Sequence, residues 1–246
     1  MKSERSVAEW ALGVLVLLQC VGAAWWWLRD GSQLGVPFVA QAIVFLGLVA
    51  VIRPSAAWLL PIAGVMFLEA LFAVARADGY AGRMSLLSQA IRYGGPLALW
   101  LLARGDERWA RTVLRWTIAA VFLAHGIKAL VLHPPFLSYI EVSIDKVFGV
   151  VLHAPVTATA TFLIGVIDVI LAVLVVLRPS KPVLAYMIFW GFLTASMRMI
   201  YFGVDGGACF TLVRALNGGA PLVLYLFTMR PTPLTFAPDF RERVSV

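Results

Sequence analysis

Residues 156–178 read VTATATFLIGVIDVILAVLVVLR, an apolar run in which Asp168 is the one charged residue before the closing Arg178. About 20 apolar residues are enough for a helix to cross the hydrocarbon core of a bilayer. Because the peptide groups of such a run find no water in hydrocarbon, they must bond to one another within a helix. This stretch therefore predicts a transmembrane helix.

The whole chain has the composition that this stretch indicates. Of its 246 residues, 61% are hydrophobic and 13% are charged, and its mean hydropathy is +0.90. A soluble domain has about 45–50% apolar and about 25% charged residues, so a soluble enzyme, a nucleic-acid-binding module and a disordered regulator fit poorly. We expect an all-α integral membrane protein with eight transmembrane helices at residues 7–28, 36–52, 55–77, 84–103, 110–132, 156–178, 183–203 and 208–228.

The positions of the basic residues predict the orientation. Short cytoplasmic loops of membrane proteins carry an excess of Lys and Arg. With the N-terminus in the cytoplasm, the outer side holds chiefly Arg29, Arg76, Arg83 and Lys146, and the inner side holds Lys2, Arg5, Arg53, Arg104, Arg108, Arg111, Arg115, Arg178, Lys181, Arg230, Arg241 and Arg243. We therefore expect both termini in the cytoplasm. From the composition, together with the family resemblance given below, we expect the protein in a bacterial inner membrane.

Two segments recur at one spacing and indicate a duplication. VIRPS at 51–55 returns as VLRPS at 176–180, and YGGPLALW at 93–100 returns as GGAPLVLY at 218–225, each 125 residues later. We expect two four-helix units, residues 1–105 and 106–230, followed by a cytoplasmic tail at 231–246. Units with an even number of spans are parallel repeats, related by an axis along the membrane normal.

The second unit holds an insertion, at residues 134–155, that the first unit lacks. Trp10 and Trp116 correspond at a spacing of only 106, so about 19 residues are added after them. Apolar residues follow helical spacing from Phe136 to Val151, while Glu141 and Asp145 lie on another face. The insertion predicts either a helix at the outer interface or a re-entrant segment that caps a cavity.

Ionisable residues inside membrane spans are costly and usually face the interior of the bundle. In the first unit Glu69 and Arg92 reach similar depth on neighbouring spans, which predicts a structural ion pair. The second unit has a larger set that predicts a polar pocket in the outer half, for an anion or a quinone head group: His125, Lys128, Asp168, Arg198 and Arg214.

Roles in such a pocket follow from the side chains. His125 would donate to a carbonyl, Asp168 would relay protons, and the arginines would hold negative charge. The same residues can instead form a buried network that fixes helix packing, with Arg198 and Arg214 reaching outward to water. The sequence does not show the two interrupted helices that are typical of transporter sites.

Metal and catalytic sites are not predicted. The three histidines, His125, His133 and His153, have no third ligand at a recognisable spacing, and there is no Ser-His-Asp arrangement. Cys20 and Cys209 are expected to be packing residues rather than a disulfide.

One part of the second unit resembles a known family. Arg115, Phe122 and the run His125-Gly126-Ile127-Lys128 resemble the first helix of the DoxX family of small four-helix membrane proteins. That family's second helix is resembled by Gly165-Val166-Ile167-Asp168 with the apolar run to Arg178. At the position of Asp168 a glutamate is usual in the family. The resemblance covers roughly residues 110–230. It implies a helical bundle that works beside partner proteins in membrane redox systems and contacts quinone.

The sequence thus leads to three functional hypotheses. The first is a non-catalytic, auxiliary subunit of a larger inner-membrane complex, redox or respiratory, with other integral membrane subunits and lipids as partners and no nucleic acid. The second is a quinone-interacting oxidoreductase subunit with His125, Lys128 and Asp168 at the head group. The third is a small-anion transporter that uses the basic pocket.

Overall fold

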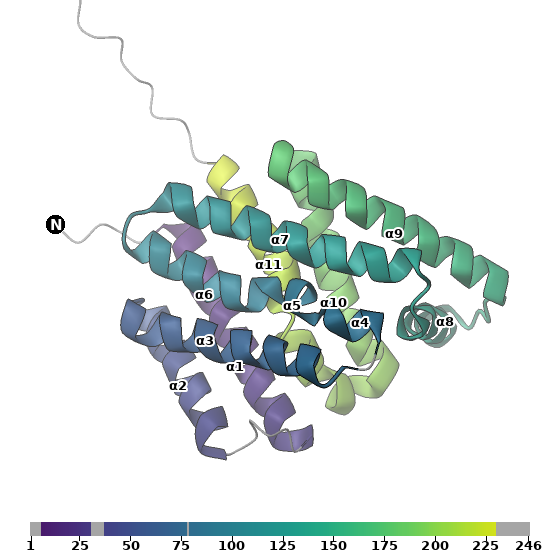
Figure 1. Cartoon of the computed structure of the whole chain (residues 1–246), viewed down its shortest axis with the longest axis horizontal. Helices are drawn as coiled ribbons and strands as arrows, with labels where there is room; N and C mark the ends of the chain where they lie inside the picture. Colours follow the sequence, from purple (N-terminus) through teal and green to yellow (C-terminus); the bar gives the residue numbers. More distant parts are fainter. Residues whose placement is uncertain (1–5, 31–36, 78, 230–246) are drawn as a thin grey trace, which may run out of the picture.

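The computed structural model describes residues 6–30, 37–77 and 79–229, and within these ranges every regular element is a helix (Figure 1). The predicted tail at 231–246 lies outside the described residues. The helices are α1 (Val7–Asp30), α2 (Pro37–Ile52), α3 (Ala56–Ala75), α4 (Tyr80–Arg83), α5 (Ser85–Ser88), α6 (Ala90–Ala103), α7 (Glu107–Leu130), α8 (Pro134–Phe148), α9 (Ala154–Leu177), α10 (Lys181–Leu212) and α11 (Ala215–Thr228).

Five of these helices are long and apolar enough to cross a membrane: α1, α3, α7, α9 and α10. The helices α2 and α11 are apolar but shorter. The prediction of an all-helical chain with several membrane-spanning segments is confirmed at this level.

The helix starts and stops follow local chemistry. Proline occupies the first turn of α8, α9 and α10, a position where its missing N–H leaves no bond unmade. Gly149 ends α8 in the left-handed region at φ 67°, and its N–H donates to the carbonyl of Asp145 at 2.8 Å. This is the usual helix stop, which a residue without a Cβ adopts most easily.

Two predicted spans are interrupted in the structure. The segment 84–103 is divided at Gln89 between α5 and α6, and the segment 208–228 is divided at Val213 and Arg214 between α10 and α11. Between the predicted spans 183–203 and 208–228 the helix α10 continues, with a kink in the backbone at Gly203 (φ 78°, ψ 169°). Apolar residues flank each interruption, so a search for long apolar runs does not detect it.

The bundle is built from helices that pack along one another. The most extensive contacts are those of α7 with α9, α10 with α11, α1 with α2, and α6 with α7. At the crossing of α7 and α9, a Cβ on Gly126 would lie 3.0 Å from the carbonyl oxygen of Gly165. The two backbones therefore meet closely because both residues lack a side chain.

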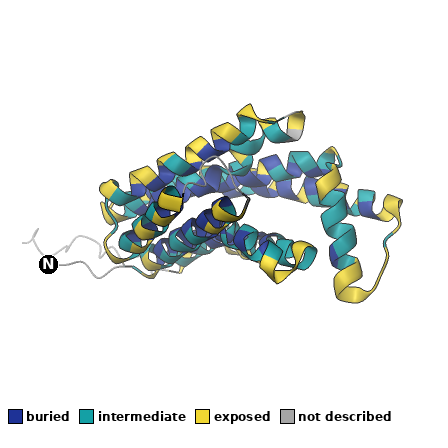
Figure 2. Cartoon of the chain, turned by 90° about the horizontal axis from the view of Figure 1, so that it is seen from below, coloured by how far each residue is buried: buried dark blue, intermediate teal, exposed yellow. Residues whose placement is uncertain are grey.

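The insertion forms α8, which lies across one end of α7 and α9 rather than alongside them (Figures 1 and 2). It also contacts α10. Lys146 of α8 donates from Nζ to the carbonyl oxygens of Ile200 (3.1 Å) and Tyr201 (2.9 Å), just before the kink in α10. The insertion thus covers the end of the bundle, in agreement with the expectation of a capping segment.

Candidate functional site

Two adjoining cavities lie beneath α8. One has a volume of about 130 Å³ and the other about 270 Å³. We call the first the apolar chamber and the second the cationic chamber, after the residues that line them. They share one wall, which consists of His125, Phe136, Tyr139, Arg198, Arg214 and Asn217.

The apolar chamber is enclosed mainly by aliphatic and aromatic side chains of α7, α8, α9 and α10, among them Phe122, Ile164 and Trp190. The lining also contains polar side chains, and two of them are already bonded within their own helices. Thr161 donates to the carbonyl of Thr157, and Thr194 donates to the carbonyl of Trp190. A mostly apolar pocket with a few polar groups is the usual form of a small-molecule site.

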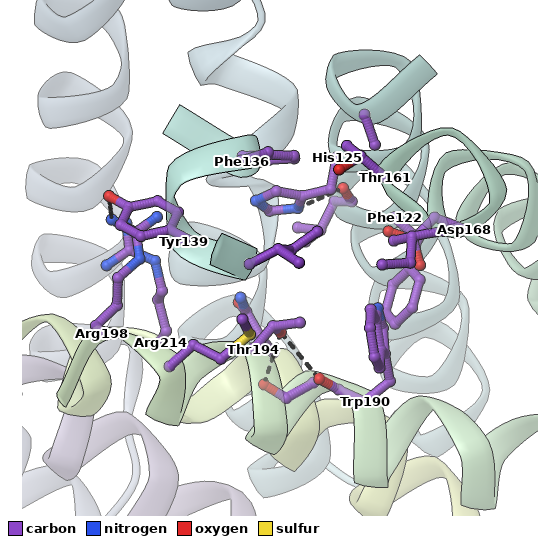
Figure 3. A pocket seen from close by; sticks show the side chains of 17 residues that line it. Phe122, His125, Phe136, Tyr139, Thr161, Asp168, Trp190, Thr194, Arg198 and Arg214 are labelled. Atoms are coloured by element: carbon purple, nitrogen blue, oxygen red, sulfur yellow. Dashed lines mark hydrogen bonds between the residues drawn. The ribbon is translucent and has the colours of Figure 1, made fainter. Parts of the chain in front are cut away.

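Of the residues that the structure describes, Asp168 is the one acidic residue that lines this chamber. Its side chain lies opposite Arg198 and Arg214 across the chamber and faces the Trp190 ring (Figure 3). The residue is 5% exposed, and Oδ1 has no hydrogen-bond partner among the described residues. Asp168 thus faces two arginines across the chamber without pairing with them, because no ion pair in the described ranges includes it. A buried carboxyl oxygen without a partner is costly, so this atom is available to a ligand.

His125 has a defined hydrogen-bonding state. Its Nδ1 lies 2.9 Å from the carbonyl oxygen of Val121, one turn earlier in α7. A carbonyl can only accept, so Nδ1 bears the proton, and in the neutral ring Nε2 is an acceptor. The ring stacks on Phe136 of α8, with centroids 6.0 Å apart. In the neutral ring Nε2 can therefore only accept a hydrogen bond, and the expected donation to a carbonyl would require the protonated ring.

The cationic chamber brings together basic residues of α6, α7 and α10 and of the break between α10 and α11. Its walls contain Arg92, Lys128, Arg198 and Arg214. Arg198 contacts Tyr139 of α8 in two ways: Nη1 donates to the hydroxyl, and the guanidinium lies 4.0 Å from the ring centroid. Such a cation–π contact holds the guanidinium in place beside the cavity.

Glu69 and Arg92 form the buried ion pair that the sequence predicts. Arg92 Nη1 lies 3.3 Å from Glu69 Oε1, and the two residues are 6% and 7% exposed. The same nitrogen donates to Gln89 Oε1 at 3.0 Å, and Gln19 Nε2 donates to the Arg92 carbonyl at 2.8 Å. Arg92 has a further role that the sequence did not indicate: its side chain also lines the cationic chamber.

The interruptions of the two divided spans both lie at the cationic chamber. Gln89 and Arg214 are the N-cap residues of α6 and α11, and Arg92 and Asn217 lie in the first turns of these helices; all four line the cavity. Two helix N-termini therefore meet at one site. The sequence did not reveal this arrangement.

His133 lies at the edge of the same chamber, between α7 and α8. Partial burial lowers the pKa of His133 below its ordinary value, and the nearby ammonium group of Lys128 lowers it further. Among the described residues no three His, Cys, Asp or Glu side chains lie close enough together to hold a metal ion.

All five residues predicted for the pocket line one chamber or the other. His125, Arg198 and Arg214 line both, Asp168 lines the apolar chamber alone, and Lys128 lines the cationic chamber alone. Sequence reasoning missed Tyr139, Trp190, Gln89 and Asn217. These residues are uncharged, and aromatic residues are too frequent in this chain, with 15 Phe, 9 Trp and 6 Tyr, for any one of them to be conspicuous.

The residues behind the family resemblance contact one another. Arg115 Nε donates to the carbonyl of Val175 at 3.2 Å, and its guanidinium also bonds the carbonyl of Val176, at the end of α9. Together with the Gly126–Gly165 crossing, these bonds fix α7 against α9. Comparison of the chain with known protein families, with curated proteins and with solved structures gives no match. The resemblance of residues 110–230 to the DoxX family stays a prediction.

Proposed function

We propose that this protein is an auxiliary integral subunit of a larger redox or respiratory assembly in a bacterial inner membrane, and that its apolar chamber takes up a quinone head group. Its partners would be other integral membrane subunits and lipids. The observation that carries the proposal is the chamber itself, whose aromatic walls surround the unpartnered Asp168 Oδ1 and the acceptor Nε2 of His125.

The proposed topology has eight spans in two parallel four-helix repeats, with both termini in the cytoplasm. Helix boundaries support the repeat, because they coincide at the spacing of 125 residues seen in the sequence. The matching starts are Ala56 with Lys181 (α3 and α10) and Ala90 with Ala215 (α6 and α11), and the matching ends are Ile52 with Leu177 and Ala103 with Thr228. A proline also lies inside both α6 and α11, again 125 residues apart.

Contacts between the repeats support the same relation. Lys128 of α7 donates to Ser88 Oγ at 3.3 Å. At the equivalent place in the other half, Gly22 of α1 packs directly on the backbone of Val213. Gly22 precedes Lys128 by the shorter spacing of 106, and Ser88 precedes Val213 by 125. Each unit therefore places its first helix against the interrupted span of the other unit.

A bound quinone would supply a two-electron redox centre; the residues of this chain would bind it and exchange protons with it. The chamber would accept a flat ring between Phe122, Phe136 and Trp190. His125 Nε2 would accept a hydrogen bond from a quinol hydroxyl, and Asp168 Oδ1 would accept one or, when protonated, donate one. This donor and acceptor set suits the reduced form of the ligand, because the neutral imidazole has no second N–H.

The site is tested by extracting lipid from the purified protein and measuring co-purified quinone by mass spectrometry. We expect stoichiometric quinone with the unaltered chain. Asp168→Ala combined with His125→Ala should lower the retained amount at least tenfold, since each lost hydrogen bond weakens binding by about fivefold to tenfold. The matched control is Asp145→Ala, which removes an exposed carboxylate of α8. Equal quinone in all three proteins would refute the site.

The auxiliary role is tested separately, by gentle extraction from native membranes followed by native mass spectrometry. Stoichiometric partner polypeptides are expected, and a stable, functional monomer without partners would contradict this part of the proposal. A small-anion transporter is the second candidate, and the two interrupted helices favour it. Anion uptake into liposomes that is lost on Arg198→Gln would establish transport instead.

A further inference from the structure

The cationic chamber carries more positive charge than its surroundings balance. Its basic side chains are Arg92, Lys128, Arg198 and Arg214, and no carboxylate of the described ranges lines it. Among the described residues, the one acid within ion-pair distance of this group is Glu69, which binds Arg92. Three arginines and one lysine against Glu69 leave a formal charge of +3, and an ionised Asp168 on the far side of the apolar chamber would still leave +2. Arginine keeps its proton in proteins, so the excess cannot be removed by deprotonating the guanidinium groups.

Most hydrogen-bond donors of this group are not used by the protein. Lys128 has three N–H donors and bonds Ser88 with one of them. Arg214 has five and bonds the carbonyl of Phe210, one turn earlier, at 3.0 Å. Within the part of the chain that the structure describes, the other donors of these two groups have no protein acceptor. Buried or half-buried charges need counter-charges and acceptors. The remaining donors of Lys128 and Arg214 are therefore available to a ligand.

The backbone adds to the positive electrostatic potential of the cationic chamber. The N-terminal ends of α6 and α11, each a helix of 14 residues, line the chamber through the N-cap residues Gln89 and Arg214 and through Arg92 and Asn217 of the first turns. The backbone N–H groups of these four residues are bonded to carbonyls of the chain, so the contribution of the helix ends is the positive end of each helix dipole, which favours anions. Two such ends and four cationic side chains from different parts of the sequence therefore favour the same kind of ligand.

We propose that the cationic chamber binds a multivalent oxyanion group of the phosphate or sulfate type. A single carboxylate would leave most of the excess charge in place, whereas a group with two or more charges balances it. The volume of about 270 Å³ is far above the roughly 30 Å³ of one water molecule, so a tetrahedral oxyanion fits with part of its hydration. The group is either a free anion or the phosphate of a lipid head group. The proposal concerns the second chamber and does not depend on quinone in the first.

The test uses the full chain in nanodiscs of neutral phosphatidylcholine. Sodium sulfate and inorganic phosphate are titrated at constant ionic strength, with chloride as the balancing anion, and followed by calorimetry and by the thermal unfolding temperature. We expect binding and a raised unfolding temperature. Arg214→Gln and Arg198→Gln should each weaken binding about tenfold to hundredfold, the usual range for a hydrogen bond to a charged group. Arg108→Gln, an equal charge change at an exposed position of α7 outside the chamber, should leave binding unchanged.

Loss of binding must be separated from loss of the fold. Without oxyanion, Arg214→Gln should unfold at a higher temperature than the unaltered chain, because the substitution removes repulsion between like charges. A misfolded variant would instead unfold at a lower temperature than the unaltered chain. As a second control, Arg214→Lys keeps the charge and should bind oxyanion better than Arg214→Gln.

A second arm identifies the source of the group. In nanodiscs of anionic phosphatidylglycerol, a lipid that stays bound in native mass spectrometry and removes the response to added sulfate supports a head-group phosphate. A response that persists there supports a free anion. The proposal is overturned if neither disc shows oxyanion binding, or if Arg214→Gln, Arg198→Gln and Arg108→Gln bind oxyanion equally well.

Discussion

The buried ion pair between Glu69 and Arg92 allows a sharp test of the energetics of this bundle. Glu69→Gln keeps the size of the side chain and removes its charge. Arg92 would then be left 6% exposed, with its guanidinium bonded to the neutral Gln89 and without its carboxylate at 3.3 Å. The substitution therefore isolates a buried charge without creating a cavity.

The expected magnitude follows from the burial of both partners. Removing one member of a buried pair costs about 3–5 kcal/mol, because the remaining charge is uncompensated, whereas replacing both by apolar residues is often neutral or stabilising. We expect Glu69→Gln to lower the free energy of unfolding by about 3–5 kcal/mol. At roughly 2–4 °C per kcal/mol for a chain of this size, the unfolding temperature should fall by roughly 6–20 °C. The double variant Glu69→Leu, Arg92→Met should lie within about 1 kcal/mol of the unaltered chain.

The assay is equilibrium unfolding by increasing mole fractions of SDS in mixed micelles, followed by circular dichroism. The matched control is Glu107→Gln, which removes the carboxylate of the partly exposed pair with Arg111 one turn along α7 and should cost about 0.5 kcal/mol or less. The reasoning is refuted if Glu69→Gln costs no more than this control, or if the double variant is as unstable as the single one.

Three further predictions concern packing, the capping helix and the edge of the cationic chamber. Gly126→Ala should destabilise the protein by about 1–3 kcal/mol through overpacking against α9, whereas Gly64→Ala, which adds a Cβ in open space, should be neutral or stabilising in the same SDS titration. Lys146→Met removes two bonds from α8 to α10, so amide hydrogen exchange in residues 134–148 should become faster; unchanged exchange would contradict the capping contact. Lys128→Met should raise the pKa of His133, which the ammonium group now lowers, and an NMR titration of the imidazole that does not move would show that the two groups are not coupled.

Much of the fold can be predicted because hydrocarbon imposes one kind of regular structure on a long apolar run. The run that contains Asp168 needs no tertiary information to be recognised as a helix. The interruption at Gln89 could not be predicted in this way, because the residues before and after it are apolar enough for either geometry. At the kink in α10 the sequence offers Gly203, Gly206 and Gly207, and only Gly203 adopts positive φ.

The candidate site was predictable for a related reason. A charge inside the membrane is costly, so Lys128, Asp168 and Arg198 are conspicuous in an apolar sequence. Their division between two chambers was not, because it depends on how α8 crosses the end of the bundle and places Tyr139 beside Arg198. The acceptor state of His125 likewise depends on its hydrogen bond to the backbone carbonyl of Val121. Every helical residue has such a carbonyl one turn before it, so the sequence does not show that this bond forms.

The buried charges also impose an order on membrane insertion. Under the proposed topology, α5 and α6 would enter the bilayer as one span, residues 84–103, with Arg92 near its middle, where an arginine costs about 2.5–3.5 kcal/mol. Glu69 lies only 23 residues earlier, so α3 and α6 can leave the translocon as a hairpin with the pair already formed. Arg214, at the start of α11, has no ion-pair partner among the described residues, and the acid nearest before it in sequence, Asp205, is exposed rather than buried beside it. Its segment would therefore be stable in the bilayer only once the earlier helices have assembled around the place it enters, which makes assembly of the second half depend on completion of the first.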